Sequence, residues 1–217
     1  MNGLHRPLMD LDSASVHVWT IQVGSPDVID SPRRRLGHRR ETREAARALL
    51  ARYVRDFAGD PLSAWRRVER PASGEVVSNL THSGRFAVLA VTRGRRVGVD
   101  LERMRPIRDA RALARRFFST PEAARLERLS ADEASEQFFK LWVRKEAYLK
   151  GVGGTVPDGL RRFETDETPS GVPILARTQL ESGDGSAWTI YDLLAPDGYV
   201  AALAIEGEPA QIEMFTT

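Results

Sequence analysis

Two carboxylate residues, Asp100 and Glu102, lie two positions apart in a segment whose other side chains are apolar or absent. Residues 97–102 read Val-Gly-Val-Asp-Leu-Glu, which predicts a strand, and successive side chains of a strand face opposite ways. Both carboxylates would then face one side, roughly 6.5–7 Å apart at the backbone. Mg²⁺ in proteins prefers oxygen ligands and often binds one or two carboxylates together with substrate phosphates. The pair could therefore hold a magnesium ion, or it could be the polar outer face of an edge strand.

Lysine is rare in this chain, and its three copies, Lys140, Lys145 and Lys150, fall within one predicted helix. At 100° per residue, Lys145 projects into the middle of the apolar stripe of that helix, and Glu146 and Lys150 follow on one flank. In one interpretation the stem of Lys145 lies along the core with its head in solvent, and Glu146 pairs with Lys150. In the other, both ammonium groups meet a phosphate and Glu146 lies beside a metal ion. The scarcity of lysine favours the second. The stripe consists of Phe138, Leu141, Trp142 and Leu149.

A histidine lies among hydroxyl side chains just before a strongly apolar segment. Thr81, His82 and Ser83 precede residues 85–91, which are nearly all apolar and predict a buried strand. We expect the residues around His82 to form a loop, from which an imidazole N–H can donate to a phosphate oxygen. A single histidine is more often an ordinary loop residue, so His82 counts only together with the other groups.

The elements that must position these groups follow from hydrophobic periodicity and turn residues. Strands are predicted at 16–23, 85–91, 97–102, 187–194 and 199–205, with a further short strand at 212–215. The turn at 93–96 predicts that the second and third of these strands form a hairpin, and the turn at 195–198 predicts another.

Helices are predicted in the stretches between these strands. They span 41–57, 109–118, a segment with Thr120 as N-cap and Pro121 at its first position, and a segment that opens with the Ser130–Glu133 capping box and ends near Lys150. The order of elements predicts an α+β fold of two similar-sized halves, 1–105 and 106–217.

Composition and charge exclude several classes of protein. The chain is 41% hydrophobic and 29% charged, has no cysteine, and contains no apolar run of the roughly 18 residues that span a bilayer. Residues 1–12 lack the apolar region of a signal peptide, so we expect a cytoplasmic protein with no membrane partner.

The net charge of +2 is distributed unevenly along the chain. Residues 33–70 hold 12 arginines against 5 acids, whereas residues 151–217 hold 3 arginines against 11 acids. The basic segment suggests an anionic ligand or partner, and the acidic end argues against non-specific nucleic-acid binding. An arginine-rich RNA-binding protein would need stacking aromatics, which make up only 7% of the chain.

Taken together, the motifs resemble the 4′-phosphopantetheinyl transferases, in particular the larger type that activates surfactin synthetase. Residues 97–102 are similar to the family's Gly-hydrophobic-Asp-hydrophobic-Glu signature. Residues 142–150, Trp-Val-Arg-Lys-Glu-Ala-Tyr-Leu-Lys, are similar to its Trp-x-x-Lys-Glu-Ala-x-x-Lys signature, and residues 81–83, Thr-His-Ser, to a third, shorter one. The lysine-containing signature is highly specific, whereas Asp-x-Glu alone is not.

The resemblance implies transfer of the phosphopantetheine arm of coenzyme A to a serine of an acyl or peptidyl carrier protein, with Mg²⁺, releasing adenosine 3′,5′-bisphosphate. It also implies a monomer whose two α+β halves are related by pseudo-twofold symmetry, with coenzyme A between them. Carried over by position, the residues expected around Mg²⁺ are Asp100, Glu102 and Glu146, with Glu146 also as general base. Lys150 and the ion would offset the charge of the leaving group. The residues expected to bind coenzyme A are Lys145, Lys150, His82, Thr81, Arg35 and Arg47.

One departure from the family concerns a phosphate contact. A Gly-Lys-Pro stretch usually precedes the Thr/Ser-His-Ser element, but residues 72–76 contain no lysine, so that contact is either missing or supplied by Arg67 or Arg70. The alternative function is a catalytically degenerate regulator that binds coenzyme A or a nucleotide. The presence of all three carboxylates and both lysines argues against it.

Overall fold

The computed structural model describes residues 11–22, 44, 48, 71–154, 159–179 and 188–216, and the elements below lie within these ranges. The strands are β1 (Ser15–Gln22), β2 (Val76–Ser83), β3 (Phe86–Arg93), β4 (Val97–Arg103), β5 (Phe163–Glu167), β6 (Pro173–Thr178), β7 (Trp188–Leu193), β8 (Tyr199–Glu206) and β9 (Gln211–Thr216). The helices are α2 (Ala110–Phe117), α3 (Thr120–Glu127) and α4 (Ala131–Gly151), with a short 3₁₀ helix at Leu160–Arg162. The α+β class is confirmed.

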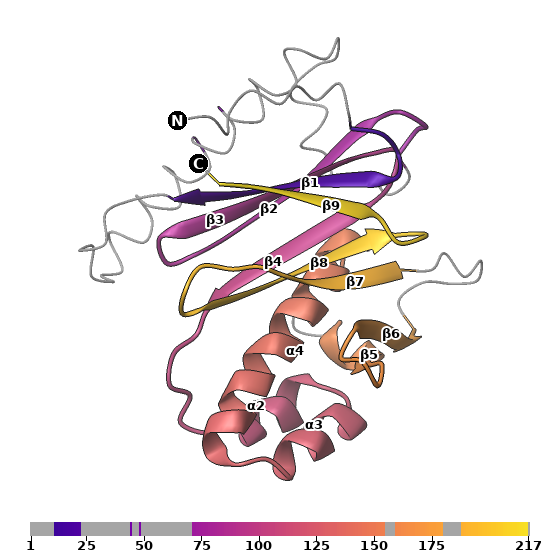
Figure 1. Ribbon diagram of the computed structural model, residues 1–217. Coiled ribbons are helices and arrows are strands. Elements are labelled where there is room, and N and C mark those ends of the chain that lie inside the picture. Colours follow the sequence, from indigo (N-terminus) through magenta and orange to yellow (C-terminus); the bar gives the residue numbers. More distant parts are fainter. Residues whose placement is uncertain are drawn as a thin grey trace.

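The strands form two sheets that lie face to face. The four-stranded sheet has the order β2-β3-β1-β9, and the five-stranded sheet has the order β4-β8-β7-β6-β5. In Figure 1 the first sheet lies above the second, and the helices lie below both. Within the first sheet β1 pairs with β3 antiparallel and with β9 parallel, so the C-terminal strand of the chain joins the N-terminal one.

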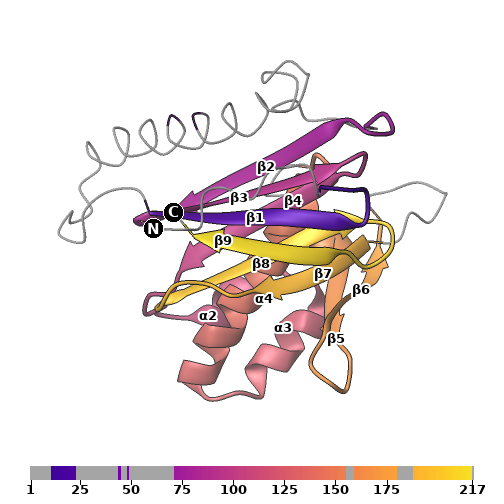
Figure 2. The same cartoon turned by 45° about the horizontal axis from the view of Figure 1, so that its top comes forward.

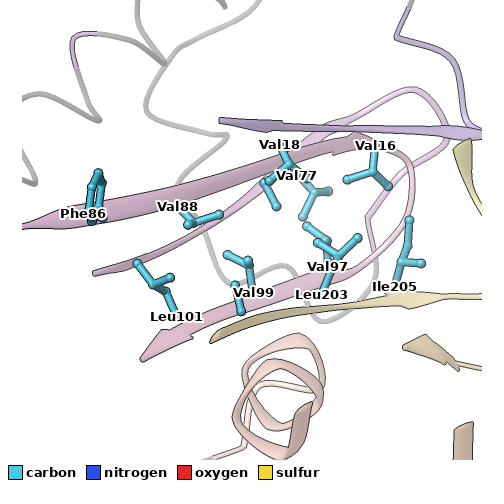
Figure 3. Close-up of a cluster of buried hydrophobic side chains, with 12 residues drawn as sticks. Val16, Val18, Val77, Phe86, Val88, Val97, Val99, Leu101, Leu203 and Ile205 are labelled. Carbon is cyan, nitrogen blue, oxygen red and sulfur yellow. The ribbon is translucent and has the colours of Figure 1, made fainter. Parts of the chain in front are cut away.

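The core between the two sheets is apolar because each sheet directs alternate side chains into it. Figure 3 shows this layer, in which β-branched residues of both sheets face one another. A second core lies between the other face of the five-stranded sheet and α4, and a third lies among the three helices. The residues drawn and labelled in Figure 3 are Val16, Val18, Val77, Phe86, Val88, Val97, Val99, Leu101, Leu203 and Ile205.

The helices begin where the sequence supplies capping groups. Ser130 and Glu133 form the capping box of α4, as predicted. A second capping box, Ser119 with Glu122, begins α3, so the prediction of Thr120 as its N-cap is wrong by one residue. Figure 2 shows α2 and α3 packed beside α4 on the side of the five-stranded sheet that faces away from β1.

Two predictions about the strands are wrong. The residues around His82 form the edge strand β2 rather than a loop. The segments 85–91 and 97–102 do not pair as a hairpin, because β3 pairs with β1 and β2 whereas β4 pairs with β8 in the other sheet. Strands β5 and β6 were not anticipated; the remaining predicted strands appear as β1, β7, β8 and β9 within one or two residues of their expected bounds.

The predicted division near residue 105 stays a prediction, and two strand pairs connect the halves on either side of it. Strand β4 precedes it but pairs with β8, and β9 follows it but pairs with β1. The predicted helix at 41–57 lies outside the described residues, apart from Glu44 and Ala48, which are helical. In the part of the chain that is described, no helix is long and apolar enough to cross a membrane.

Candidate active site

Asp100 and Glu102 lie on one face of β4, as the alternation of the sequence predicted. The other face of this strand packs into the core between the sheets through Val97, Val99 and Leu101. Asp100 is only 4% exposed, and Glu102 is half-buried. Two acidic groups are thus held on a rigid strand and turned away from the apolar layer, towards α4.

Helix α4 approaches β4 very closely at Gly98. A Cβ atom on Gly98 would overlap the carbonyl oxygen of Ala147 and lie 2.5 Å from the backbone nitrogen of Gly151. Only glycine therefore allows the last turn of α4 to lie directly on this strand. Because Gly98 shares its face of β4 with Asp100, the approach brings the end of α4 to the carboxylates.

The structure brings Lys150, at the end of α4, into direct contact with Asp100. Its Nζ atom donates to Oδ1 of Asp100 over 2.6 Å, to Oγ1 of Thr81 over 3.1 Å and to the carbonyl oxygen of Val99 over 3.3 Å. The side chain of Lys150 is 29% exposed, so its ammonium lies at the edge of the site rather than inside it.

Glu146, one turn before Lys150 on α4, has a strongly shifted pKa. Burial, together with the negative charges of Asp100 and Glu102, raises the pKa of Glu146 to about 7 against the opposing effect of Lys150. Burial likewise raises the pKa of Asp100, where Lys150 and Thr81 oppose the shift. Burial and the charge of Asp100 raise the pKa of Glu102. The three carboxylates therefore act electrostatically on one another.

The carboxylates offer oxygen ligands of the kind that a metal ion could use. As the side chains stand, no three His, Asp or Glu residues within the described ranges form a set that could hold one. One atom nevertheless fits a cation, because Oδ2 of Asp100 is buried and has no hydrogen-bond partner. A buried polar atom without a partner costs free energy. A hard cation would satisfy it and offset the mutual repulsion of the carboxylates, and their all-oxygen donors suit Mg²⁺.

Lys145 lies elsewhere, which differs from both interpretations of the sequence. It is fully buried on another side of α4, and its Nζ donates to Oε1 and Oε2 of Glu122 over 2.9 and 2.8 Å and to the carbonyl oxygen of Phe163 over 2.6 Å. An ammonium has three hydrogens, and all three are used inside the protein. Lys145 neither extends into solvent nor is available to a phosphate of coenzyme A.

Thr81 and His82 are neighbours on β2, and only Thr81 is bonded to the cluster of Asp100, Glu102, Glu146 and Lys150. Oγ1 of Thr81 donates to Oδ1 of Asp100 over 3.0 Å. Because successive side chains of a strand face opposite ways, His82 points away from Asp100. The other two residues expected to bind coenzyme A, Arg35 and Arg47, lie outside the described residues, as do Arg67 and Arg70.

Sequence reasoning missed Gly98 as a contact point, Glu122 as the partner of Lys145, and the hydroxyl groups of β2 as partners of the carboxylates. Glu122 had a visible signal, since it stands three residues after Ser119 in a capping-box pattern. Its second role, as acceptor for Lys145, depends on how α3 packs against α4 and has no local signal.

The chain is similar to known proteins over about half of its length. The family model described as "4′-phosphopantetheinyl transferase superfamily" matches residues 96–204, half of the chain. The chain is 34% identical over 139 residues to the 4′-phosphopantetheinyl transferase HetI of Nostoc sp., covering 64% of this chain and 55% of HetI. It is 34% identical over 122 residues to the 4′-phosphopantetheinyl transferase AcpT of Escherichia coli, covering 55% of this chain and 61% of AcpT. The chain thus spans about half the length of the curated relatives it matches.

Among solved structures, a holo-(acyl-carrier-protein) synthase from Bacillus anthracis in complex with coenzyme A (3′,5′-ADP) superposes with a TM-score of 0.43. The identity is 18%, and the match covers 52% of this chain and 96% of the synthase. The family match itself includes β4 with its two carboxylates, α4 with Glu146 and Lys150, and most of the paired strand β8. The chain belongs to the 4′-phosphopantetheinyl transferase superfamily.

Proposed function

We propose that the protein transfers the 4′-phosphopantetheine arm of coenzyme A to a serine of an apo acyl or peptidyl carrier protein. The observation that carries the proposal is the convergence of three acidic side chains and one ammonium group where α4 meets β4. Membership of the superfamily and the names of the relatives support the same activity. The groups concerned are Asp100, Glu102, Glu146 and Lys150.

In the proposed reaction the serine hydroxyl oxygen attacks the phosphorus that carries the pantetheine arm. A new P–O bond forms to serine, and the P–O bond to the other phosphate of the pyrophosphate breaks. The bonding electron pair leaves with adenosine 3′,5′-bisphosphate, and the serine proton passes to a base. Such phosphoryl transfers depend mainly on positioning and on neutralising charge at the leaving group.

Glu146 is the base that we propose. A general base works best when its pKa lies near the operating pH, and burial together with Asp100 and Glu102 raises the pKa of Glu146 to about 7. Because Glu146 is half-buried at the edge of the cluster, a substrate hydroxyl can reach its carboxylate.

Lys150 is the group that we propose to meet the pyrophosphate. Its ammonium is a compact charge on a flexible four-carbon stem, it is partly exposed, and it already lies beside the carboxylates. Asp100, Glu102 and Glu146 would hold Mg²⁺, which when bound neutralises charge on the phosphates and the leaving group. His82 remains a proposed phosphate contact outside the cluster.

The proposal includes a monomeric, cytoplasmic enzyme with coenzyme A bound between residues 1–105 and 106–217. Its protein partners are apo carrier domains, whose acidic surfaces would complement the basic segment 33–70. That segment lies outside the described residues, so the expected complementarity rests on its sequence alone.

The test is a transfer assay read by mass spectrometry. The chain, coenzyme A and Mg²⁺ are incubated with an apo carrier protein, and we expect the carrier to gain the mass of one phosphopantetheine arm. The Glu146→Gln variant should form much less product, and Lys140→Met is the control because Lys140 pairs with Glu136 on the outer surface of α4. Binding of coenzyme A without any transfer would favour the degenerate regulator instead.

A further inference from the structure

Strand β2 contacts β4 through three alternate side chains. Asn79 accepts the backbone N–H of Val99 at its Oδ1 over 3.1 Å, and Thr81 donates to Oδ1 of Asp100 over 3.0 Å. The third, Ser83, donates from Oγ to Oε2 of Glu102 over 3.0 Å. Alternate residues of a strand face the same way, so all three reach across to β4. The two strands belong to different sheets, and this polar row joins the sheet edges.

The hydrogen of each hydroxyl is committed to a carboxylate. The ammonium of Lys150 can only donate, so Oγ1 of Thr81 accepts from it, and the single hydroxyl hydrogen of Thr81 remains for Asp100. The same logic applies at Ser83. Its Oγ accepts the backbone N–H of Arg103 over 3.0 Å, which leaves its hydrogen for Glu102.

These bonds fix the orientation of the Asp100 carboxylate and leave one of its two equivalent oxygens without a partner. Oδ1 accepts from Thr81 and from Lys150, whereas Oδ2 is buried and accepts nothing. A half-turn of the carboxylate would only exchange two equivalent oxygens, but a partial rotation would break both bonds. Thr81 therefore helps to hold the carboxylate of Asp100 in one orientation.

We propose that Thr81 and Ser83 are positioning residues, which hold the carboxylates of Asp100 and Glu102 in the orientation that binds a divalent cation. This inference rests on the proposed function for the identity of the cation. Hydrogen-bond partners behind metal-binding carboxylates typically affect metal affinity or activity by 10- to 100-fold when they are removed. Thr81 is 8% exposed, so water does not readily replace its hydroxyl.

The experiment measures Mg²⁺ binding by isothermal titration calorimetry of the full chain, with and without coenzyme A. Thr81→Val keeps the shape of the side chain and removes its hydroxyl, and we expect its Kd for Mg²⁺ to rise at least about tenfold. Thr81→Ser restores the hydroxyl and should stay within about threefold of the wild type. Thr92→Val is the matched control, because Thr92 is fully buried on β3 and its hydroxyl donates only to the backbone oxygen of Ser15.

Thermal unfolding of the same variants separates positioning from folding. We expect Thr81→Val to unfold cooperatively, with a melting temperature near that of Thr92→Val. If it does not fold, Ser83→Ala supplies the measurement, since Ser83 is less buried, and its Kd should rise about threefold or more. Mg²⁺ affinity unchanged by the loss of either hydroxyl would overturn the inference.

Arm transfer by the wild type is measured in parallel. If the wild type binds Mg²⁺ and transfers the arm, and Thr81→Val does both equally well, the proposed function stands. The positioning role of Thr81 is then excluded. Wild type that transfers the arm but binds no Mg²⁺ also removes the positioning role. Wild type that binds Mg²⁺ but transfers nothing overturns the proposed function, while a weakened Thr81→Val still supports positioning of the cation.

Discussion

Lys145 on α4 and Glu122 on α3 form an ion pair in which neither side chain has any solvent exposure. The carboxylate of Glu122 also accepts the backbone N–H of Ser119 and both the backbone N–H and the hydroxyl of Thr165. Every polar atom of the pair is satisfied, and the network joins α3, α4 and β5. Burial lowers the pKa of Lys145, and the charge of Glu122 opposes that shift.

Replacing only one member of this pair should destabilise the protein strongly. Lys145→Met leaves Glu122 buried without its counter-ion, which typically costs about 3–5 kcal/mol of the free energy of unfolding. The double variant Lys145→Met/Glu122→Gln should recover part of the loss, because it removes the unpaired buried charge and keeps an acceptor for the N–H groups of Ser119 and Thr165. Urea unfolding measures both, and Lys140→Met, from an exposed pair, should cost less than about 1 kcal/mol. A Lys145→Met variant as stable as the wild type would show that the ion pair is unimportant.

Gly98→Ala should separate α4 from β4. The added Cβ would overlap the backbone of Ala147, and backbone atoms cannot rotate away as a side chain can. We expect a loss of about 1–3 kcal/mol in the free energy of unfolding and a fall of about a hundredfold in transfer, since a displacement near 1 Å at reacting groups has that effect. Denaturant unfolding and the transfer assay measure the two losses.

Gly171→Ala is the control for this substitution. Its Cβ would meet nothing within 4 Å, but Gly171 has a φ of +81°, so the change should cost about 1–2 kcal/mol through backbone strain alone. Transfer by Gly171→Ala should therefore stay near the wild-type rate. If Gly98→Ala lost stability but kept full activity, the close approach of α4 would have no role in the reaction.

The parts of the site that were predictable depend on local patterns. The alternation of 97–102 placed Asp100 and Glu102 on one face of β4, and the capping box at Ser130 located the start of α4. Helical periodicity also placed Lys145 on the buried side of α4, although the favoured interpretation put its ammonium at a phosphate together with that of Lys150. These features follow from spacing within one element, which the sequence states directly.

The features that were not predictable depend on which elements meet. Residues 76–83 are mostly polar, so they resemble a loop, yet their backbone pairs with β3 and their side chains bond to β4. The turn after β3 resembles a hairpin turn, but the chain passes there from one sheet to the other. The partner of Lys145 is 23 residues away on α3. Such pairings are set by long-range packing and leave no local pattern.

Glu146 should give the protein a characteristic pH dependence when Mg²⁺ is absent. Its pKa is raised from 4.5 to about 7, so between these values the folded state retains a proton that the unfolded state has released. The free energy of unfolding should therefore fall as the pH rises through this window. Denaturant unfolding in EDTA from pH 4.5 to 8 should show a smaller fall for Glu146→Gln, with the remaining slope coming from Asp100 and Glu102. Identical slopes for both proteins would contradict the raised pKa of Glu146.

The same raised pKa predicts the acid limb of the pH–rate profile. If Glu146 accepts the serine proton, kcat/KM for the carrier protein should rise tenfold per pH unit below about 7 and level off above it. A bound cation favours the carboxylate form, so saturating Mg²⁺ should move this limb to lower pH. A profile that is flat from pH 5 to 8 would assign the proton transfer to another group.

Lys150 and Lys140 are the two lysines of α4 that are not fully buried, and they should differ sharply in their effect on transfer. Lys150 donates to Asp100 and Thr81, whereas Lys140 donates to Glu136 on the outer surface of the helix. Removing one charge that stabilises a leaving group commonly lowers kcat by about 10²–10³-fold, and we expect Lys150→Met to fall in that range. Lys140→Met should stay within about twofold of the wild type, and steady-state kinetics with coenzyme A and an apo carrier protein measure both. Equal losses in the two variants would mean that a general effect of positive charge on α4, rather than the contact of Lys150 with the carboxylate cluster, supports the reaction.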